Sequence, residues 1–173
     1  MKSFKEYIIE GKEPTYYHST NKEYNVGDII SASKNNRGYF GQWENLFHKH
    51  KPNSEVSRLN SLYLTKQRWF SEQFGVNTYK VIPVGNYSSC AFGWLAILMS
   101  KYDHLVKGFN KKERYLLSKP NKNEIEEIRY FINQYYSGKI PTAREIRKYD
   151  YESDSETKVK EILTNKMKII KKL

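Results

Sequence analysis

The fold class is decided by two adjoining runs, VNTYKVIPVG at residues 76–85 and CAFGWLAILMSKYDHLV at residues 90–106. Apolar and polar residues alternate in the first run, which predicts a β-strand with one buried face. The second run is nearly all apolar at its start and predicts a helix, although Gly93 weakens the pattern. Its apolar part, CAFGWLAILM, is about half as long as the ~20 residues of a membrane span. We therefore expect a core helix.

Strand and helix patterns follow one another on both sides of these runs. This mixed order favours an α+β fold. We expect a single domain with a small split antiparallel sheet and flanking helices. Strand patterns occur at residues 15–20, 29–31, 62–64 and in two runs around the Thr-Asn turn at 164–165; helix patterns occur from residue 42 to 50, at 68–75 and at 124–138, where Gly138 is the expected C-cap.

Composition and charge indicate the class of partner. The chain has 173 residues, enough for one domain with one core, and a formal net charge of +11. Such a charge favours polyanions, namely DNA, RNA, an anionic membrane or a dinucleotide phosphate. A solvated lysine-rich surface explains the charge equally well, so charge alone identifies no site.

The sequence predicts neither a disulfide nor a metal site. Cys90 is the single cysteine and lies in an apolar run, so we expect a buried structural thiol in a reducing compartment. The four histidines lack the paired spacing with cysteine that zinc sites use. No glycine-rich nucleotide-binding motif of the Rossmann or P-loop type occurs.

The first ten residues, MKSFKEYIIE, form a small amphipathic unit with Phe4, Tyr7 and Ile8 on one helical face. The segment resembles the capsid-targeting leader of internal head proteins of T-even-type myoviruses. The resemblance implies a leader at residues 1–10 and a domain at residues 11–173. The prohead protease would recognise Ile8 and Glu10 and cut between Glu10 and Gly11. The alternative is an ordinary helix that packs on the domain.

Four short motifs, spread over most of the chain, carry a second resemblance. They are Tyr-His-Ser-Thr at residues 17–20, Leu-Tyr-Leu-Thr at 62–65, Tyr-Lys-Val-Ile-Pro-Val-Gly at 79–85 and Glu-Ile-Leu at 161–163. Together they resemble the ADP-ribosyltransferase-like fold in its His-Tyr-Glu form. The resemblance implies a transferase that uses NAD as its substrate.

The resemblance also implies a role for each site residue. Cleavage of the nicotinamide–ribose bond passes through an oxocarbenium-like state. The Glu161 carboxylate would either stabilise this cation or activate the acceptor. Tyr63 would stack on nicotinamide, and His18 with Thr20 would hold the ribose and the amide. Arg58 would pair with the pyrophosphate.

Some features of the sequence depart from this pattern. Arginine-specific transferases carry an earlier Glu where this chain has Val159, and Glu145 is a second candidate for the acidic residue. Residues 90–119 have no counterpart in the pattern and are expected to be an insertion. Each site residue also has a structural alternative: a core position for His18 or Tyr63, and a surface cation or salt bridge for Arg58 and Glu161.

Two main functions follow from these patterns. The first is a phage internal head protein that is carried in the virion and injected into the host cytoplasm, where it ADP-ribosylates a host protein or nucleic acid. The second is a basic packaged protein that binds DNA or inhibits a host defence nuclease without catalysis. An enzyme acting on phosphodiesters ranks below both, because no cluster of metal ligands is visible and His48 and His50 would not share a helical face.

Overall fold

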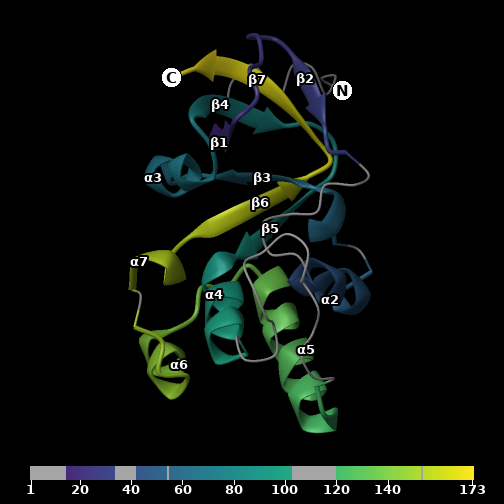
Figure 1. Ribbon diagram of the computed structural model, residues 1–173, viewed down its shortest axis with the longest axis vertical. Coiled ribbons are helices and arrows are strands. Elements are labelled where there is room, and N and C mark those ends of the chain that lie inside the picture. Colours follow the sequence, from purple (N-terminus) through teal and green to yellow (C-terminus); the bar gives the residue numbers. More distant parts are fainter. Residues whose placement is uncertain (1–14, 34–41, 54, 103–119, 153) are drawn as a thin grey trace, which may run out of the picture.

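The computed structural model describes residues 15–33, 42–53, 55–102, 120–152 and 154–173 (Figure 1). The predicted leader and its processing site at Ile8, Glu10 and Gly11 lie outside the described residues. The strands are β1 (Tyr16–Thr20), β2 (Ile29–Ser31), β3 (Leu62–Thr65), β4 (Asn77–Pro83), β5 (Tyr87–Ala91), β6 (Lys160–Thr164) and β7 (Lys166–Lys172). The helices are α2 (Gln42–His50), α3 (Arg68–Ser71), α4 (Phe92–Lys101), α5 (Lys122–Tyr136), α6 (Ala143–Lys148) and α7 (Asp154–Thr157), with 3₁₀ turns η1 (Arg58–Asn60) and η2 (Glu72–Phe74).

The described strands form one antiparallel sheet in the order β2-β7-β4-β1-β3-β6-β5. We call β2, β7, β4 and β1 the outer half-sheet, and β3, β6 and β5 the inner half-sheet. The halves join at β1 and β3, where the Tyr17–Thr65 pair gives the register. The predicted α+β class and antiparallel pairing are confirmed, but the described strands form one continuous sheet of seven strands where a small split sheet was expected.

The two half-sheets pack against each other across an apolar layer, which we call the sheet core. The inner half-sheet contributes Leu62, Leu64 and Ile162 to this layer. The outer half-sheet contributes Tyr16, Tyr79, Val81, Met167 and Ile169. The sheet therefore bends between β1 and β3, and its halves become two layers of the molecule.

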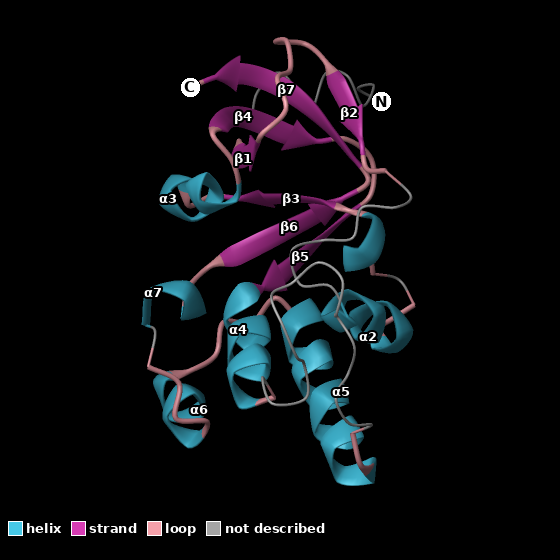
Figure 2. Cartoon of the chain, viewed as in Figure 1, coloured by secondary structure: helices cyan, strands magenta, loops and turns pink. Residues whose placement is uncertain are grey.

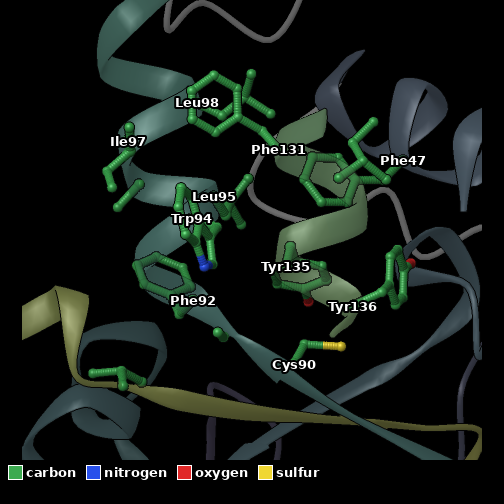
Figure 3. Close-up of a cluster of buried hydrophobic side chains, with 14 of the residues drawn as sticks. Phe47, Cys90, Phe92, Trp94, Leu95, Ile97, Leu98, Phe131, Tyr135 and Tyr136 are labelled. Carbon is green, nitrogen blue, oxygen red and sulfur yellow. The ribbon is translucent and has the colours of Figure 1, made fainter. Parts of the chain in front are cut away.

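A second apolar cluster, the helix core, lies between the inner half-sheet and α2, α4 and α5 (Figure 2). Figure 3 shows Trp94 and Leu95 of α4 beside Phe131 and Tyr135 of α5. Residues 92–98 of α4 are all buried, which explains why this segment is apolar on every side.

The structure corrects the start of this central helix. Cys90 and Ala91 belong to β5, where they pair with Glu161 and Lys160, and α4 begins at Phe92. The predicted helix from residue 90 was wrong for these two positions because strand pairing outweighed the local apolar pattern. Residues 90–101 of the expected insertion supply the middle of the helix core; residues 103–119 lie outside the described residues.

Helix α5 has clear signals at both ends. Asn121 and Glu124 form a capping box at its start. Ser137 is the C-cap residue, and the expected cap Gly138 follows it in the left-handed conformation with a φ of +67°. The helix therefore has a defined length, and its buried face includes Phe131 and Tyr135.

Gly93 is required by close packing between α4 and α7. A Cβ atom at this position would lie 2.6 Å from the backbone oxygen of Thr157 and 3.0 Å from Cγ of Pro141. We expect Gly93→Ala to lower the free energy of unfolding by about 1–3 kcal/mol, because the backbone of α7 must move. Urea unfolding measures this change, and Ser100→Ala, at an exposed position of the same helix, should stay within about 0.5 kcal/mol. Equal effects of the two variants would contradict the packing argument.

Candidate functional site

Arg58 is an arginine buried in the apolar interior. It lies in η1, just before β3, and only 1% of its surface is exposed. Its guanidinium carbon lies 4.8 Å from the ring centre of Tyr63 and 5.3 Å from that of Tyr135. Aromatic faces attract a cation, and the attraction is stronger when water is excluded.

Glu161 provides the opposite charge. It is the second residue of β6 and is 4% exposed. Its Oε2 accepts hydrogen bonds from the Arg58 guanidinium and, at 2.5 Å, from the Tyr135 hydroxyl. The guanidinium also donates to the Tyr135 oxygen at 2.6 Å. We call Arg58, Tyr63, Tyr135 and Glu161 the Arg58 cluster.

Tyr63 connects this cluster to the first strand. Its hydroxyl donates to the backbone oxygen of Arg58 at 2.6 Å, and its ring lies against the Arg58 guanidinium. Tyr63 therefore contacts both the backbone and the side chain of Arg58. The backbone oxygen of Tyr63 lies 3.0 Å from Nδ1 of His18. Because a carbonyl oxygen only accepts, Nδ1 of His18 carries the proton and Nε2 is left as an acceptor in the neutral ring.

Burial lowers the pKa of His18 below its usual 6.5, and the hydrogen bond to the Tyr63 carbonyl opposes part of this shift. The ring is therefore neutral at pH 7. In the register of β1 with β4, His18 pairs with Tyr79 and shares its face of the sheet by strand alternation. Tyr63 and Glu161 belong to the opposite face, toward the helices, so His18 reaches the backbone of Tyr63 and not its ring.

Thr20 occupies a different position from the other predicted residues. It is the last residue of β1, and its hydroxyl accepts a hydrogen bond from the backbone amide of Lys22 at 3.2 Å. The structure thus brings four of the five predicted residues, His18, Arg58, Tyr63 and Glu161, into one chain of contacts. Thr20 instead closes the turn after the strand.

Two members of this region were missed as site residues. Tyr135 belongs to the apolar stripe of α5, which the sequence pattern identified only as core. Cys90 lies opposite Glu161 in the β5–β6 pairing and is fully buried, as expected for a structural thiol. Burial, together with the Glu161 carboxylate, raises the pKa of Cys90, so the thiol is a poor nucleophile.

Glu145, the rival acidic residue, lies in α6. Its carboxylate completes a capping box with Thr142. It also lines a surface pocket of about 490 Å³ together with two tyrosines and two cations. The full lining is Tyr130, Thr142, Arg144, Glu145, Lys148 and Tyr149. Glu145 therefore has a structural role at a helix start, apart from the Arg58 cluster.

The part of the chain that the structure describes shows neither a metal centre nor a membrane-spanning helix. Within it, no group of three or more His, Cys, Asp or Glu side chains is arranged to hold a metal ion. No helix among the described residues has the length and apolar character needed to cross a membrane.

No protein-family model matches the sequence, and no curated protein matches it either.

The buried ion pair should contribute strongly to stability. Arg58→Met leaves the Glu161 charge buried without its cation, so we expect the free energy of unfolding to fall by about 3–5 kcal/mol. The double variant Arg58→Met/Glu161→Gln should recover part of this loss. Arg68→Met removes the exposed pair with Glu72, whose side chains are 54% and 43% exposed, and should cost about 0–1 kcal/mol. Urea unfolding distinguishes these cases, and similar losses for Arg58→Met and Arg68→Met would contradict the assignment.

His18 should make stability depend on pH. Its pKa is lowered in the folded chain, so the unfolded chain binds more protons once the pH falls below about 6.5. We expect the free energy of unfolding to decrease from pH 7 to pH 5, and His18→Asn to reduce that slope. Unfolding measured at a series of pH values tests this. A slope unchanged in His18→Asn would show that other groups produce it.

Proposed function

We propose that this chain is an NAD-dependent ADP-ribosyltransferase. The observation that carries the proposal is that the His, Tyr and Glu of the motif lie on three neighbouring strands, β1, β3 and β6. His18 and Tyr63 are 45 positions apart in sequence yet are hydrogen-bonded, and Arg58 and Glu161 are 103 positions apart yet form an ion pair. Motif residues that are distant in sequence but close in the fold favour a common function over separate structural roles.

The chemistry of these residues suits glycosidic bond cleavage. Nicotinamide would leave with the bonding electron pair, and the positive charge that develops on the ribose needs a fixed carboxylate nearby. The Tyr135 hydroxyl donates to the Glu161 carboxylate at 2.5 Å and would keep it oriented during the reaction. The acceptor would then bond to the ribose C1 carbon and lose its proton to Glu161. Nε2 of neutral His18 would accept a hydrogen bond from a ribose hydroxyl.

In the described conformation the Glu161 carboxylate is buried and paired. The proposal therefore requires the Arg58 cluster to open when NAD binds. The guanidinium would exchange the carboxylate for the pyrophosphate of NAD, which keeps a positive charge paired throughout. Tyr63, which already stacks on that guanidinium, would then offer its ring to nicotinamide.

The leader resemblance adds the biological setting to this proposal. The protein would be packaged in a phage head, cut after Glu10 by the prohead protease and injected with the genome. Its acceptor would be a protein or nucleic acid of the host. The second candidate function, a basic packaged protein without catalysis, is favoured by the lysines that are exposed on β7.

The test uses the full chain, NAD labelled in its adenylate half and a lysate of host cells. Labelled acceptor and free nicotinamide are the two readouts. We expect Glu161→Gln to reduce both by at least about 100-fold, the usual range for a lost acid–base group. Glu145→Gln is the matched control and should retain activity, because Glu145 caps α6 and lies apart from the Arg58 cluster. Circular dichroism must show that each variant is folded.

Three results would overturn the proposal or its assignment. Folded wild-type chain that releases no nicotinamide and shows no change of unfolding temperature with NAD is not such a transferase. Full activity in a folded Glu161→Gln variant would remove Glu161 from the reaction. Loss of activity in Glu145→Gln alone would move the catalytic carboxylate to α6.

A further inference from the structure

The outer half-sheet has one face in the sheet core and one face turned away from it. In β7, Met167 and Ile169 are fully buried in the sheet core, while Lys166 and Lys168, which alternate with them along the strand, are exposed. Strand alternation therefore puts these two lysines on the outward face. The sequence pattern of β7 is that of a strand with one buried apolar face and one exposed charged face.

Neighbouring strands extend this charged face. Lys171 of β7 pairs with Lys80 of β4 after a register shift between Lys80 and Val81, and Lys80 is half-buried. Lys168 lies between Ile82 of β4 and Ile29 of β2, and Lys166 pairs with Ser31. We call Lys80, Lys166, Lys168 and Lys171 the lysine face.

Among the described residues, the strands of the lysine face carry no acidic side chain, and Asp28 lies just before β2. The strands β1, β2, β4 and β7 contain no Asp or Glu. Within the described residues, none of these four lysines forms an ion pair. Lys172, also in β7, pairs with Glu23. A group of like charges without counter-charges attracts a polyanion from solution.

Among the described residues, most of the face is open. Figure 2 shows α2, α4, α5, α6 and α7 gathered on the far side of the inner half-sheet. Helix α3 packs against the start of β4, where Ser71 and Thr78 both hydrogen-bond to Ser19, whereas Lys166, Lys168 and Lys171 are exposed. Lysines two positions apart on a strand repeat every ~7 Å, and neighbouring strands are ~5 Å apart. A flat array of this kind suits an extended chain of phosphates better than a single small anion, which prefers a concave site.

We propose that the lysine face binds the phosphate backbone of nucleic acid. It lies on the opposite side of the sheet core from the Arg58 cluster, so this binding is independent of NAD chemistry. Recognition through phosphates implies little dependence on base sequence and a strong dependence on salt. Serine, isoleucine and lysine on β2 and β7 supply no aromatic wedge, which favours nucleic acid over insertion into a lipid surface.

The test is fluorescence anisotropy of the full chain with a labelled single-stranded oligonucleotide of about 20 nucleotides, over a series of salt concentrations. The face variant replaces Lys80, Lys166, Lys168 and Lys171 with Gln. The control variant replaces Lys66, Lys122, Lys139 and Lys148 with Gln, all exposed and elsewhere on the described surface, so both variants lose the same charge. All four positions of the face variant lie outside the Arg58 cluster.

We expect the face variant to bind at least tenfold more weakly and the slope of log K against log salt to fall by about 3, since each lost phosphate contact removes about 0.7–0.9. The control variant should change the slope by less than about 1. Equal weakening in both variants, or no binding by the wild type, would overturn the proposal. Binding only to vesicles that contain phosphatidylserine would overturn it in favour of a membrane. Nicotinamide release should be unchanged in the face variant, so this proposal and the transferase proposal can fail separately.

Discussion

The rest of the structure depends on the buried contact between the Arg58 guanidinium and the Glu161 carboxylate. Two charges removed from water are tolerated only when each satisfies the other and additional hydrogen bonds complete the arrangement. Tyr135 supplies such a bond from α5, and the ring of Tyr63 covers the guanidinium from β3. One ion pair thus fixes η1, β3, β6 and α5 relative to one another beside the apolar helix core.

Much of the fold follows from local patterns. The alternation in residues 77–83 and the apolar stripe of α5 correspond to elements found where they were predicted. The error at Cys90 has a clear cause, since an apolar run of this length fits a buried strand as well as a helix, and only pairing with β6 decides between them. The bend between the half-sheets could not be predicted from the sequence, because it depends on which strands contribute residues to the sheet core.

Of the five residues predicted for the candidate site, His18, Arg58, Tyr63 and Glu161 lie in one chain of contacts, whereas Thr20 lies apart and Tyr135 was missed. Motif order suggested that His18, Tyr63 and Glu161 act together, and they do lie on adjacent strands. Sequence could not show that Arg58 and Glu161 bind each other, because that contact spans 103 positions and depends on the register of β3 and β6. Tyr135 carried no signal beyond its place in an amphipathic stripe, which is equally the signature of an ordinary core tyrosine.

The order of strands in the sheet also bears on how the chain is assembled during synthesis. The last two strands in sequence enter different halves, with β6 between β3 and β5 and β7 between β2 and β4. The inner half-sheet is incomplete until β6 has left the ribosome, and the outer half-sheet until β7 has left it. A nascent chain must therefore carry Arg58 without its acidic partner for about 100 residues of elongation, or roughly 5–20 s. Closure of so long a loop makes folding slow and late. Such a nascent chain has a prolonged need for protection from aggregation.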